Sequence, residues 1–303
     1  MTDVLPSWKA GPTRDQLVGF LDQVADVAPE DRVAVLDNDG TLWCEKPQYT
    51  QFDFMIGALQ EAVATNPSVA EREEFAALLG GDQAAIAEVG LVRLVHALAE
   101  LFAGTSPEAF AERARRFVMT AEHRALGRPY ATTIYQPMLE LLDELRRRGF
   151  VVFIVTGGGT EFVRAVSREL YDVTPDRVVG TLVRYELTRT DGAPNLLRTA
   201  DLDGGANEGA TKVENIQRHL GRRPIFAAGN SPGDTEMLEY AAAAPGPSLA
   251  LIVEHDDDTR EYAYESVGAT VDTSEAFSET ARTAGWTVVS MRDDWSTVFP
   301  ERR

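Results

Sequence analysis

Short apolar segments recur along the chain, and each is bounded by Gly, Pro, Asp or Asn. Runs this short and this rich in β-branched residues are typical of strands with both faces buried, as in a parallel sheet. The pattern therefore predicts six buried strands. They are expected at 33–37 (VAVLD), 151–158 (VVFIVTGG), 177–183, 224–230, 249–256 and 286–291.

Helical patterns lie between several of these strands. Segments 137–150, 159–170 and 209–221 carry apolar residues at helical spacing, such as Leu142 and Leu145 in the first of them. Alternating strands and helices are the signature of an α/β fold with a parallel sheet. We therefore expect an α/β, doubly wound, Rossmann-like core.

One long interval lacks strands. From about residue 46 to 128 the chain is rich in Ala, Glu and Leu and indicates about four amphipathic helices. An insertion of this size between the first two strands is expected to form a second small domain. We predict a helical cap at 46–129 and a core domain made of 1–45 and 130–303. A hairpin is expected within 184–200.

Composition narrows the classes of partner. The 303 residues include 29 Lys plus Arg against 48 Asp plus Glu, a formal net charge of −19, and no large basic cluster. Nucleic acid is therefore not an expected partner. No run of 18 apolar residues and no leader-like N-terminus are present, so we expect no membrane association and a cytoplasmic location. The single cysteine, Cys44, excludes an intrachain disulfide.

Polar residues follow the predicted strands at the edge where parallel sheets bind ligands. Asp37 and Asp39 close the first strand, and a Thr-Gly-Gly-Gly run, 156–159, closes the second. Asn230 and Asp234 follow the fourth, and Lys212 begins the helix that precedes it.

Each of these groups has a chemical use. Residues i and i+2 of an extended segment share a face, so Asp37 and Asp39 can flank one reacting atom. One carboxylate can attack as a nucleophile and the other can exchange a proton. Hydroxyl and amide groups at a helix start, from Thr156 onward, suit an anion. Oxygen ligands such as Asp37, Asn230 and Asp234 suit Mg²⁺.

The ordered set DNDGT, VTGG, Lys212 and GNSPGD resembles the four motifs of the haloacid dehalogenase superfamily. The resemblance is to its phosphatase branch with a helical cap, as in phosphoserine phosphatases, and it covers roughly residues 33 to 255.

The resemblance implies a role for each matching residue. Asp37 would be the nucleophile and Asp39 the general acid and base. Lys212 would pair with the nucleophile and the phosphate. The remaining implied residues are Thr156 and Gly157 on the phosphate, and Asn230, Asp234 and the main-chain carbonyl of Asp39, beside Asp37, at the Mg²⁺ site. Asn230 departs from the family pattern, in which many members have Asp, and either Asn230 or Asp234 could touch the metal directly.

Residues that enter the cap are further candidates. Five of them could contact the substrate: Trp43, Glu45, Phe52, Asp53 and Met55. Three cap arginines could meet a substrate anion: Arg93, Arg116 and Arg124. The four histidines, His96, His123, His219 and His255, share no spacing and are expected at the surface or in packing.

The resemblance and the residues together predict an enzyme, a phosphatase with Mg²⁺ as cofactor and a small phosphorylated metabolite as substrate. Dehalogenation of a 2-haloacid expels a halide, which needs no proton, so the presence of Asp39 argues against it. A phosphomutase also needs the acid-base Asp and stays an alternative. A non-catalytic phosphate-binding protein is disfavoured by the joint presence of Asp37, Asp39, Lys212 and Asp234.

Overall fold

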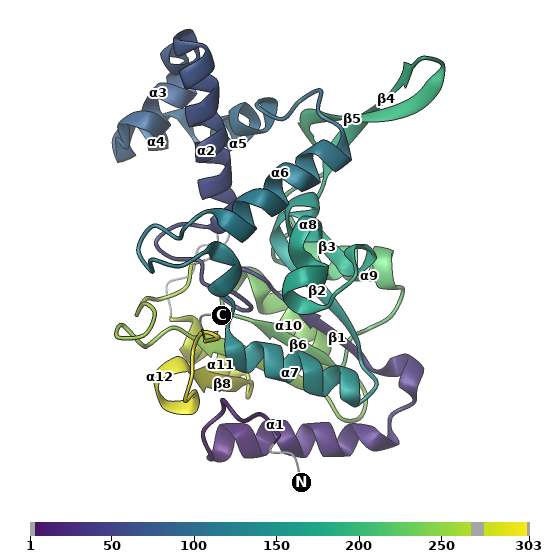
Figure 1. Cartoon of the computed structure of the whole chain (residues 1–303). Coiled ribbons are helices and arrows are strands. Elements are labelled where there is room, and N and C mark those ends of the chain that lie inside the picture. The colour runs from purple at the N-terminus through teal and green to yellow at the C-terminus, as the bar shows by residue number, and fades with distance from the viewer. Residues whose placement is uncertain (1–3, 268–275, 302–303) are drawn as a thin grey trace.

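A six-stranded parallel sheet forms the centre of the computed structural model, which describes residues 4–267 and 276–301 (Figure 1). The strand order is β3-β2-β1-β6-β7-β8, and every neighbouring pair is parallel. The predicted strands and the α/β doubly wound class are confirmed. The strands are β1 (Val33–Leu36), β2 (Val151–Gly159), β3 (Val178–Thr181), β6 (Phe226–Gly229), β7 (Leu249–Glu254) and β8 (Thr287–Ser290).

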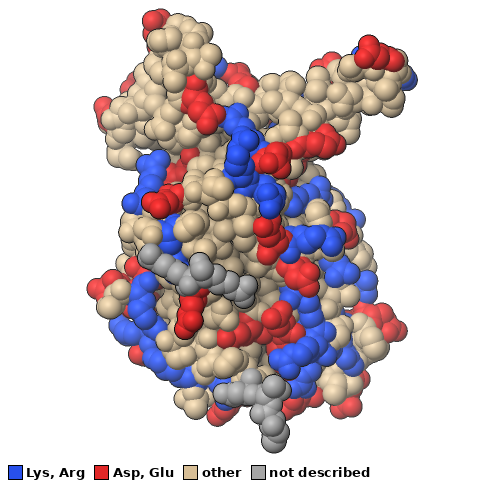
Figure 2. Space-filling model, in the orientation of Figure 1, with Lys and Arg blue, Asp and Glu red and all other residues tan. Residues whose placement is uncertain are grey.

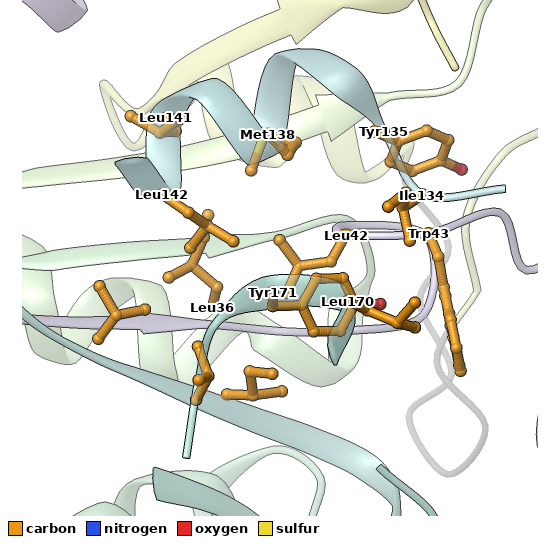
Figure 3. Close-up of a cluster of buried hydrophobic side chains, with 14 of the residues drawn as sticks. Leu36, Leu42, Trp43, Ile134, Tyr135, Met138, Leu141, Leu142, Leu170 and Tyr171 are labelled. Carbon is orange, nitrogen blue, oxygen red and sulfur yellow. The ribbon is translucent and has the colours of Figure 1, made fainter. Parts of the chain in front are cut away.

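Helices cover both faces of the sheet because successive side chains of a strand point to opposite sides. On β1, Val33 and Val35 belong to one buried cluster, and Ala34 and Leu36 belong to another. Figure 3 shows side chains of two covering helices, α7 and α8, gathered about Leu36. The second cluster is covered by α1 (Pro12–Gln23), α7 (Gln136–Arg147) and α8 (Thr160–Tyr171), and the first by α9 (Ala210–Leu220), α10 (Thr235–Ala242) and α11 (Phe277–Thr283). A short helix, α12 (Met291–Asp294), follows β8.

The interval between β1 and β2 is helical, as the pattern predicts, with five α-helices where about four were expected. The extra boundary arises because Gly81, at φ +66°, ends one short helix and the Asp82 side chain caps the next. Leu59, Phe75 and Leu98 belong to a separate apolar cluster that joins three of these helices, and Val89 of a fourth helix packs in a smaller cluster. The remaining helix packs in the main core through Phe110. The five helices are α2 (Thr50–Thr65), α3 (Glu73–Gly80), α4 (Gln83–Val89), α5 (Leu91–Glu100) and α6 (Pro107–Thr120).

The expected hairpin is confirmed and projects from the body of the molecule (Figure 1). Strands β4 (Val183–Thr190) and β5 (Ala193–Leu202) are antiparallel and meet at Asp191 and Gly192. Both turn residues have positive φ, 51° and 82°, as a two-residue hairpin loop requires. The base of the hairpin is attached to the helical segment, since the guanidinium of Arg198 lies 3.8 Å from the centre of the Phe110 ring.

Positive and negative side chains are interspersed over the face seen in Figure 2, which carries no single large basic patch. Within residues 4–267 and 276–301, no helix combines the length and the apolar character needed to cross a bilayer.

Candidate active site

The residues predicted for catalysis and metal binding meet at the carboxyl ends of β1 and β6. These strands are neighbours in the sheet, although β2, β3 and the hairpin strands β4 and β5 lie between them in the sequence. Such a reversal of strand order leaves a crevice at the strand ends, which is where open α/β sheets bind ligands. The amide of Asp37 donates to the carbonyl of Ala228 at 2.9 Å, so the two strands stay paired up to the site.

The ammonium group of Lys212 joins three segments at this edge. Its Nζ lies 2.6 Å from Oδ1 of Asp37, 2.6 Å from Oδ1 of Asp234 and 2.9 Å from the carbonyl oxygen of Val155. Only 2% of Lys212 is exposed. Since an ammonium has three N–H donors, all of them are used within the protein. Lys212 can therefore act on a bound phosphate through its charge and by holding Asp37.

The charges on Lys212 and Asp37 stabilise each other. Burial alone would lower the pKa of Lys212, but the carboxylates of Asp234 and Asp37 raise it above its ordinary value, so the amine stays protonated. Burial raises the pKa of Asp37, and the Lys212 ammonium opposes that rise. Lys212 donates to Oδ1 of Asp37 and not to Oδ2. The bond to Oδ1 fixes the orientation of the carboxylate and thereby the direction of Oδ2.

Asp39 is oriented by Trp43. The indole Nε1–H donates to Oδ1 of Asp39 at 2.9 Å, and the side-chain Nδ2 of Asn38 lies 3.5 Å from Oδ2. Partial burial raises the pKa of Asp39, which favours its protonated form. Trp43 itself is 1% exposed and packs against Phe162 and Tyr171, so its N–H has a fixed direction.

A tight turn links the two carboxylates to the rest of the loop. The amides of Thr41, Leu42 and Trp43 all point to the carbonyl of Asn38, at 2.8–3.2 Å. Gly40 has φ +73°, and a Cβ there would lie 2.1 Å from Nδ2 of Asn230. Only glycine fits this position, both by its backbone conformation and by the space available.

The Thr-Gly-Gly-Gly segment lies beside Asp39. The Thr156 hydroxyl oxygen accepts the amide of Gly158 at 2.9 Å, which leaves its proton free to donate to an anion. The amide of Gly159 donates to Oε1 of Gln51 at 2.7 Å. Gln51 belongs to α2, so a residue of the inserted helices contacts the candidate phosphate cradle directly.

Asn230 and Asp234 occupy different surroundings. Oδ1 of Asp234 accepts from Lys212, and its Oδ2 accepts the amides of Asn230 and Ser231, each at 3.1 Å. Asp234 is fully buried. Both carboxylate oxygens of Asp234 therefore accept hydrogen bonds from the protein. The side chain of Asn230 instead lies over Gly40, where its Oδ1 accepts from the Thr41 hydroxyl at 3.2 Å.

Glu45 is a buried carboxylate next to Asn230. Its Oε1 accepts from Nδ2 of Asn230 at 3.3 Å and from the Tyr264 hydroxyl at 2.8 Å. Burial raises the pKa of Glu45. Of the five cap-entry candidates, Trp43 and Glu45 thus lie in contact with site residues.

The other three cap-entry candidates are held in the packing of the helical segment. Asp53 accepts from the Tyr130 hydroxyl at 2.6 Å and pairs with Nε of Arg124 at 2.7 Å. Phe52 and Met55 pack against the cluster around Leu59 and Phe75. Two further cap arginines lie at the surface: Arg93, which pairs with Glu73 and Glu74, and Arg116.

Three further residues lie near the site, although none of them was predicted to belong to it. Gln51 is a single polar residue on an amphipathic helix, and Tyr264 lies in an irregular segment. His255, expected in packing, is buried but also bonded: its Nε2 lies 2.8 Å from the carbonyl oxygen of Gly40.

The donors at this edge fit Mg²⁺ better than a softer metal. They are oxygens: the carboxylate of Asp37, the main-chain carbonyl of Asp39, and the side-chain amide oxygen of Asn230, which lies over Gly40. In the part of the chain that the structure describes, no group of three or more His, Cys, Asp or Glu is arranged to hold a metal ion. Mg²⁺ commonly uses only one or two carboxylates and completes its shell with waters and substrate phosphate.

Comparison with known proteins agrees with the motif set. The sequence model of the haloacid dehalogenase-like hydrolase family matches residues 34–239. The search of curated proteins found no significant match.

A solved structure with a TM-score above 0.5 shares the fold. A protein with unknown function from Bordetella pertussis Tohama I is 16% identical, with a TM-score of 0.52 over 85% of this chain and 97% of that one. A HAD family hydrolase from Salmonella enterica serovar Typhi is 16% identical over 73% of this chain and 62% of that one, with a TM-score of 0.41. A phosphoserine phosphohydrolase-like protein from Francisella tularensis is 17% identical over 83% and 99%, with a TM-score of 0.39.

Proposed function

The chain belongs to the haloacid dehalogenase-like hydrolase family, and we propose that it hydrolyses a small phosphomonoester with Mg²⁺ as cofactor. The observation that carries this proposal is the oriented carboxyl of Asp39, two residues beyond Asp37, with its pKa raised and its Oδ1 held by Trp43. An alkoxide leaving group needs a proton, whereas a halide does not. A positioned acid at this place therefore favours phosphoester chemistry over dehalogenation.

Asp37 is the proposed nucleophile. Lys212 holds Oδ1, so Oδ2 attacks phosphorus while the bond from phosphorus to the leaving oxygen breaks. The leaving oxygen takes the proton of Asp39, which releases the alcohol and leaves an aspartyl-phosphate on Asp37. Asp39, now a carboxylate, takes a proton from water, and the resulting hydroxide attacks phosphorus. Phosphate departs, and both carboxyl groups return to their starting states.

The phosphoryl oxygens are proposed to bind the Thr156 hydroxyl and the amide of Gly157. The Thr156 proton is available because its oxygen is already an acceptor for Gly158. Lys212 contributes positive charge to the phosphate without a direct hydrogen bond, since its three N–H groups are used by Asp37, Asp234 and Val155.

We propose that Asp37, the carbonyl of Asp39 and Asn230 hold Mg²⁺, and that Asp234 supports the site through Lys212 and the Asn230 amide. When bound, the metal would neutralise part of the phosphate charge and orient it for attack. Such a positive charge is needed, because phosphate brings about −2 to a site that already holds the carboxylates of Asp37 and Asp234 and only one ammonium, that of Lys212.

Residues 46–129 are proposed to act as the cap over this site. Gln51, at the start of α2, already bonds to Gly159, so the cap and the cradle meet in this conformation. A cap in contact with the phosphate loop excludes water and limits the leaving group to a small molecule. The proposed substrate is accordingly a small phosphorylated metabolite.

The test is a screen of phosphomonoesters that includes p-nitrophenyl phosphate, with and without Mg²⁺, and with a 2-haloacid in parallel. We expect Mg²⁺-dependent release of phosphate and no release of halide. Conversion of one sugar phosphate isomer into another, without free phosphate, would indicate a phosphomutase instead. Lack of phosphate release from every ester, with or without Mg²⁺, would contradict the proposal.

A further inference from the structure

A buried histidine holds the turn between the two catalytic carboxylates and the cap. The chain leaves β7 at Glu254, and the next residue, His255, turns its ring toward Gly40. The His255 Nε2 lies 2.8 Å from the Gly40 carbonyl oxygen. Since a carbonyl can only accept, Nε2 must carry the proton and donate it.

The second ring nitrogen is held by a carboxylate. Because a carboxylate can only accept, Nδ1 of His255 also carries a proton and donates it to Oε2 of Glu261, which lies 3.3 Å away. Oε1 of Glu261 accepts from the Tyr135 hydroxyl at 2.9 Å, and Oε2 also accepts the amide of Tyr262 at 2.7 Å. The side chains of His255 and Glu261 are both fully buried. A buried carboxylate with this many partners is a fixed acceptor, so it sets the orientation of the imidazole.

Ring stacking adds a third restraint. The imidazole lies parallel to the Tyr264 ring, with centroids 4.4 Å apart and planes 22° apart. The Tyr264 hydroxyl in turn donates to Glu45 at 2.8 Å. His255 can therefore neither rotate about its ring axis nor tilt away from Gly40 without breaking several buried contacts.

The position of the acceptor explains why such a restraint matters. Gly40 separates Asp39 from Thr41, and glycine restrains its own backbone least of all residues. The amide of Gly40 donates to the carbonyl of Trp43 at 2.9 Å, and its carbonyl accepts from His255. Without the second bond, the peptide between Gly40 and Thr41 could rotate. That rotation would displace Asp39 on one side and the Thr41 hydroxyl, which bonds to Asn230, on the other.

We propose that His255, oriented by Glu261, is a positioning residue that fixes the Gly40 carbonyl and thereby the geometry of Asp39 and Asn230 in the reaction. This inference rests on the proposed phosphatase function. Both residues lie beyond the segment 34–239 that matches the family model, so the restraint comes from a part of the chain outside that match.

Two substitutions separate the hydrogen bond from packing. His255→Phe keeps an aromatic ring against Tyr264 but has no donor, whereas His255→Gln keeps an N–H that can reach the Gly40 carbonyl. His219→Phe is the matched control, because His219 is an exposed histidine on α9. The assay is p-nitrophenyl phosphate hydrolysis with Mg²⁺, together with the melting temperature of each variant.

We expect His255→Phe to lower kcat by roughly 10- to 100-fold with little change in KM, as a displacement of about 1 Å in a catalytic group does. His255→Gln is expected to recover most of kcat, and His219→Phe to match the wild type. If His255→Phe does not fold, His255→Met serves as the variant without a donor. Wild-type kcat in the variant without a donor, or equal loss in His255→Gln, would overturn the inference.

A measurement that needs no activity keeps this inference separate from the proposed function. In the ¹⁵N–¹H spectrum of the histidine rings, the wild type is expected to show a slowly exchanging Nε2–H signal that His255→Gln removes. Its absence would overturn the inference even in an active enzyme. A wild type that shows the signal but releases no phosphate would instead overturn the proposed function, and the positioning role would fall with it.

Discussion

Lys212 and Asp234 form a buried ion pair, with Nζ 2.6 Å from Oδ1 and neither side chain more than 3% exposed. The pair does more than neutralise two charges. Asp234 also accepts the amides that begin the loop after β6, and Lys212 also holds Asp37. One ion pair thus links the proposed nucleophile to the loop that carries Asn230.

Lys212→Met should destabilise the protein by about 3–5 kcal/mol, because removing one partner leaves buried carboxylates without compensation. The carboxylates in question are those of Asp37 and Asp234. Chemical denaturation at pH 7 measures the change in the free energy of unfolding. Activity should be lost as well.

The double variant Lys212→Met/Asp234→Asn is the control for this prediction. It removes one of the two unpaired charges, so part of the stability should return while activity stays absent. A Lys212→Met variant as stable as the wild type would contradict the proposed role of the Lys212–Asp234 pair in linking Asp37 to the loop after β6.

Trp43→Phe should move the alkaline limb of the pH profile of kcat/KM to higher pH. The indole N–H stabilises the charged form of Asp39 and so lowers its pKa, against the larger effect of burial. Without that hydrogen bond the pKa of Asp39 rises further, and the protonated acid persists to higher pH. We also expect a loss in kcat of roughly tenfold, the cost of one hydrogen bond to a charged group.

Trp8→Phe is the matched control, since Trp8 is also buried and donates its Nε1–H, at 3.0 Å, to the carbonyl of Pro137, while its ring packs on Trp295. Its pH profile should match that of the wild type. A limb that shifts to lower pH in Trp43→Phe would contradict the assigned hydrogen bond.

Asp39→Asn should abolish turnover but raise the melting temperature at neutral pH. The folded-state pKa of Asp39 is raised by burial, so the stability that its protonated form contributes is present below the unfolded pKa of about 3.9 and is lost as pH rises through the folded pKa. Asparagine is neutral at every pH and still offers an oxygen to Trp43. The gain in melting temperature should therefore shrink as the pH is lowered toward 4, and a gain that grows on acidification would contradict the direction of the shift.

Asn230→Asp should not by itself improve Mg²⁺ binding, because the new carboxylate would face Glu45 across the present 3.3 Å contact. Asn230→Asp combined with Glu45→Gln removes that repulsion and should bind Mg²⁺ about tenfold more tightly than the wild type, since affinity rises with ligand charge. The rise of melting temperature with Mg²⁺ concentration measures this without any assay of turnover. Tighter binding in the single variant than in the double variant would contradict this account of Glu45.

The strands of the core could be predicted from the sequence because both of their faces are buried. β1 is apolar at all four positions and has helices on each side, so a continuous apolar run indicates it directly. The helical insertion was predictable in kind but not in number. Its short helices α3 and α4 are separated by a glycine and a capping aspartate, which a pattern of apolar residues does not resolve.

Adjacency along the chain also explains which site residues could be predicted. Asp37 and Asp234 each follow a strand, and strand ends of a parallel sheet meet at one edge. Gln51 lies on a helix and follows no such rule, whereas His255 directly follows β7 but was expected only at the surface or in packing. Each reaches the site through one contact with a residue 108 and 215 positions away in the sequence, and a lone polar residue gives no sign of such a partner.

The most direct measurement of the central claim is the detection of a phosphoryl group on Asp37. Wild-type protein, mixed with p-nitrophenyl phosphate and Mg²⁺ and quenched in acid within one turnover, is digested and analysed by mass spectrometry. We predict that the peptide containing Asp37 gains the mass of one phosphoryl group, and that Asp37→Asn gains none. Mg²⁺-dependent phosphate release that persists in Asp37→Asn, or phosphoryl transfer to another residue, would contradict the account.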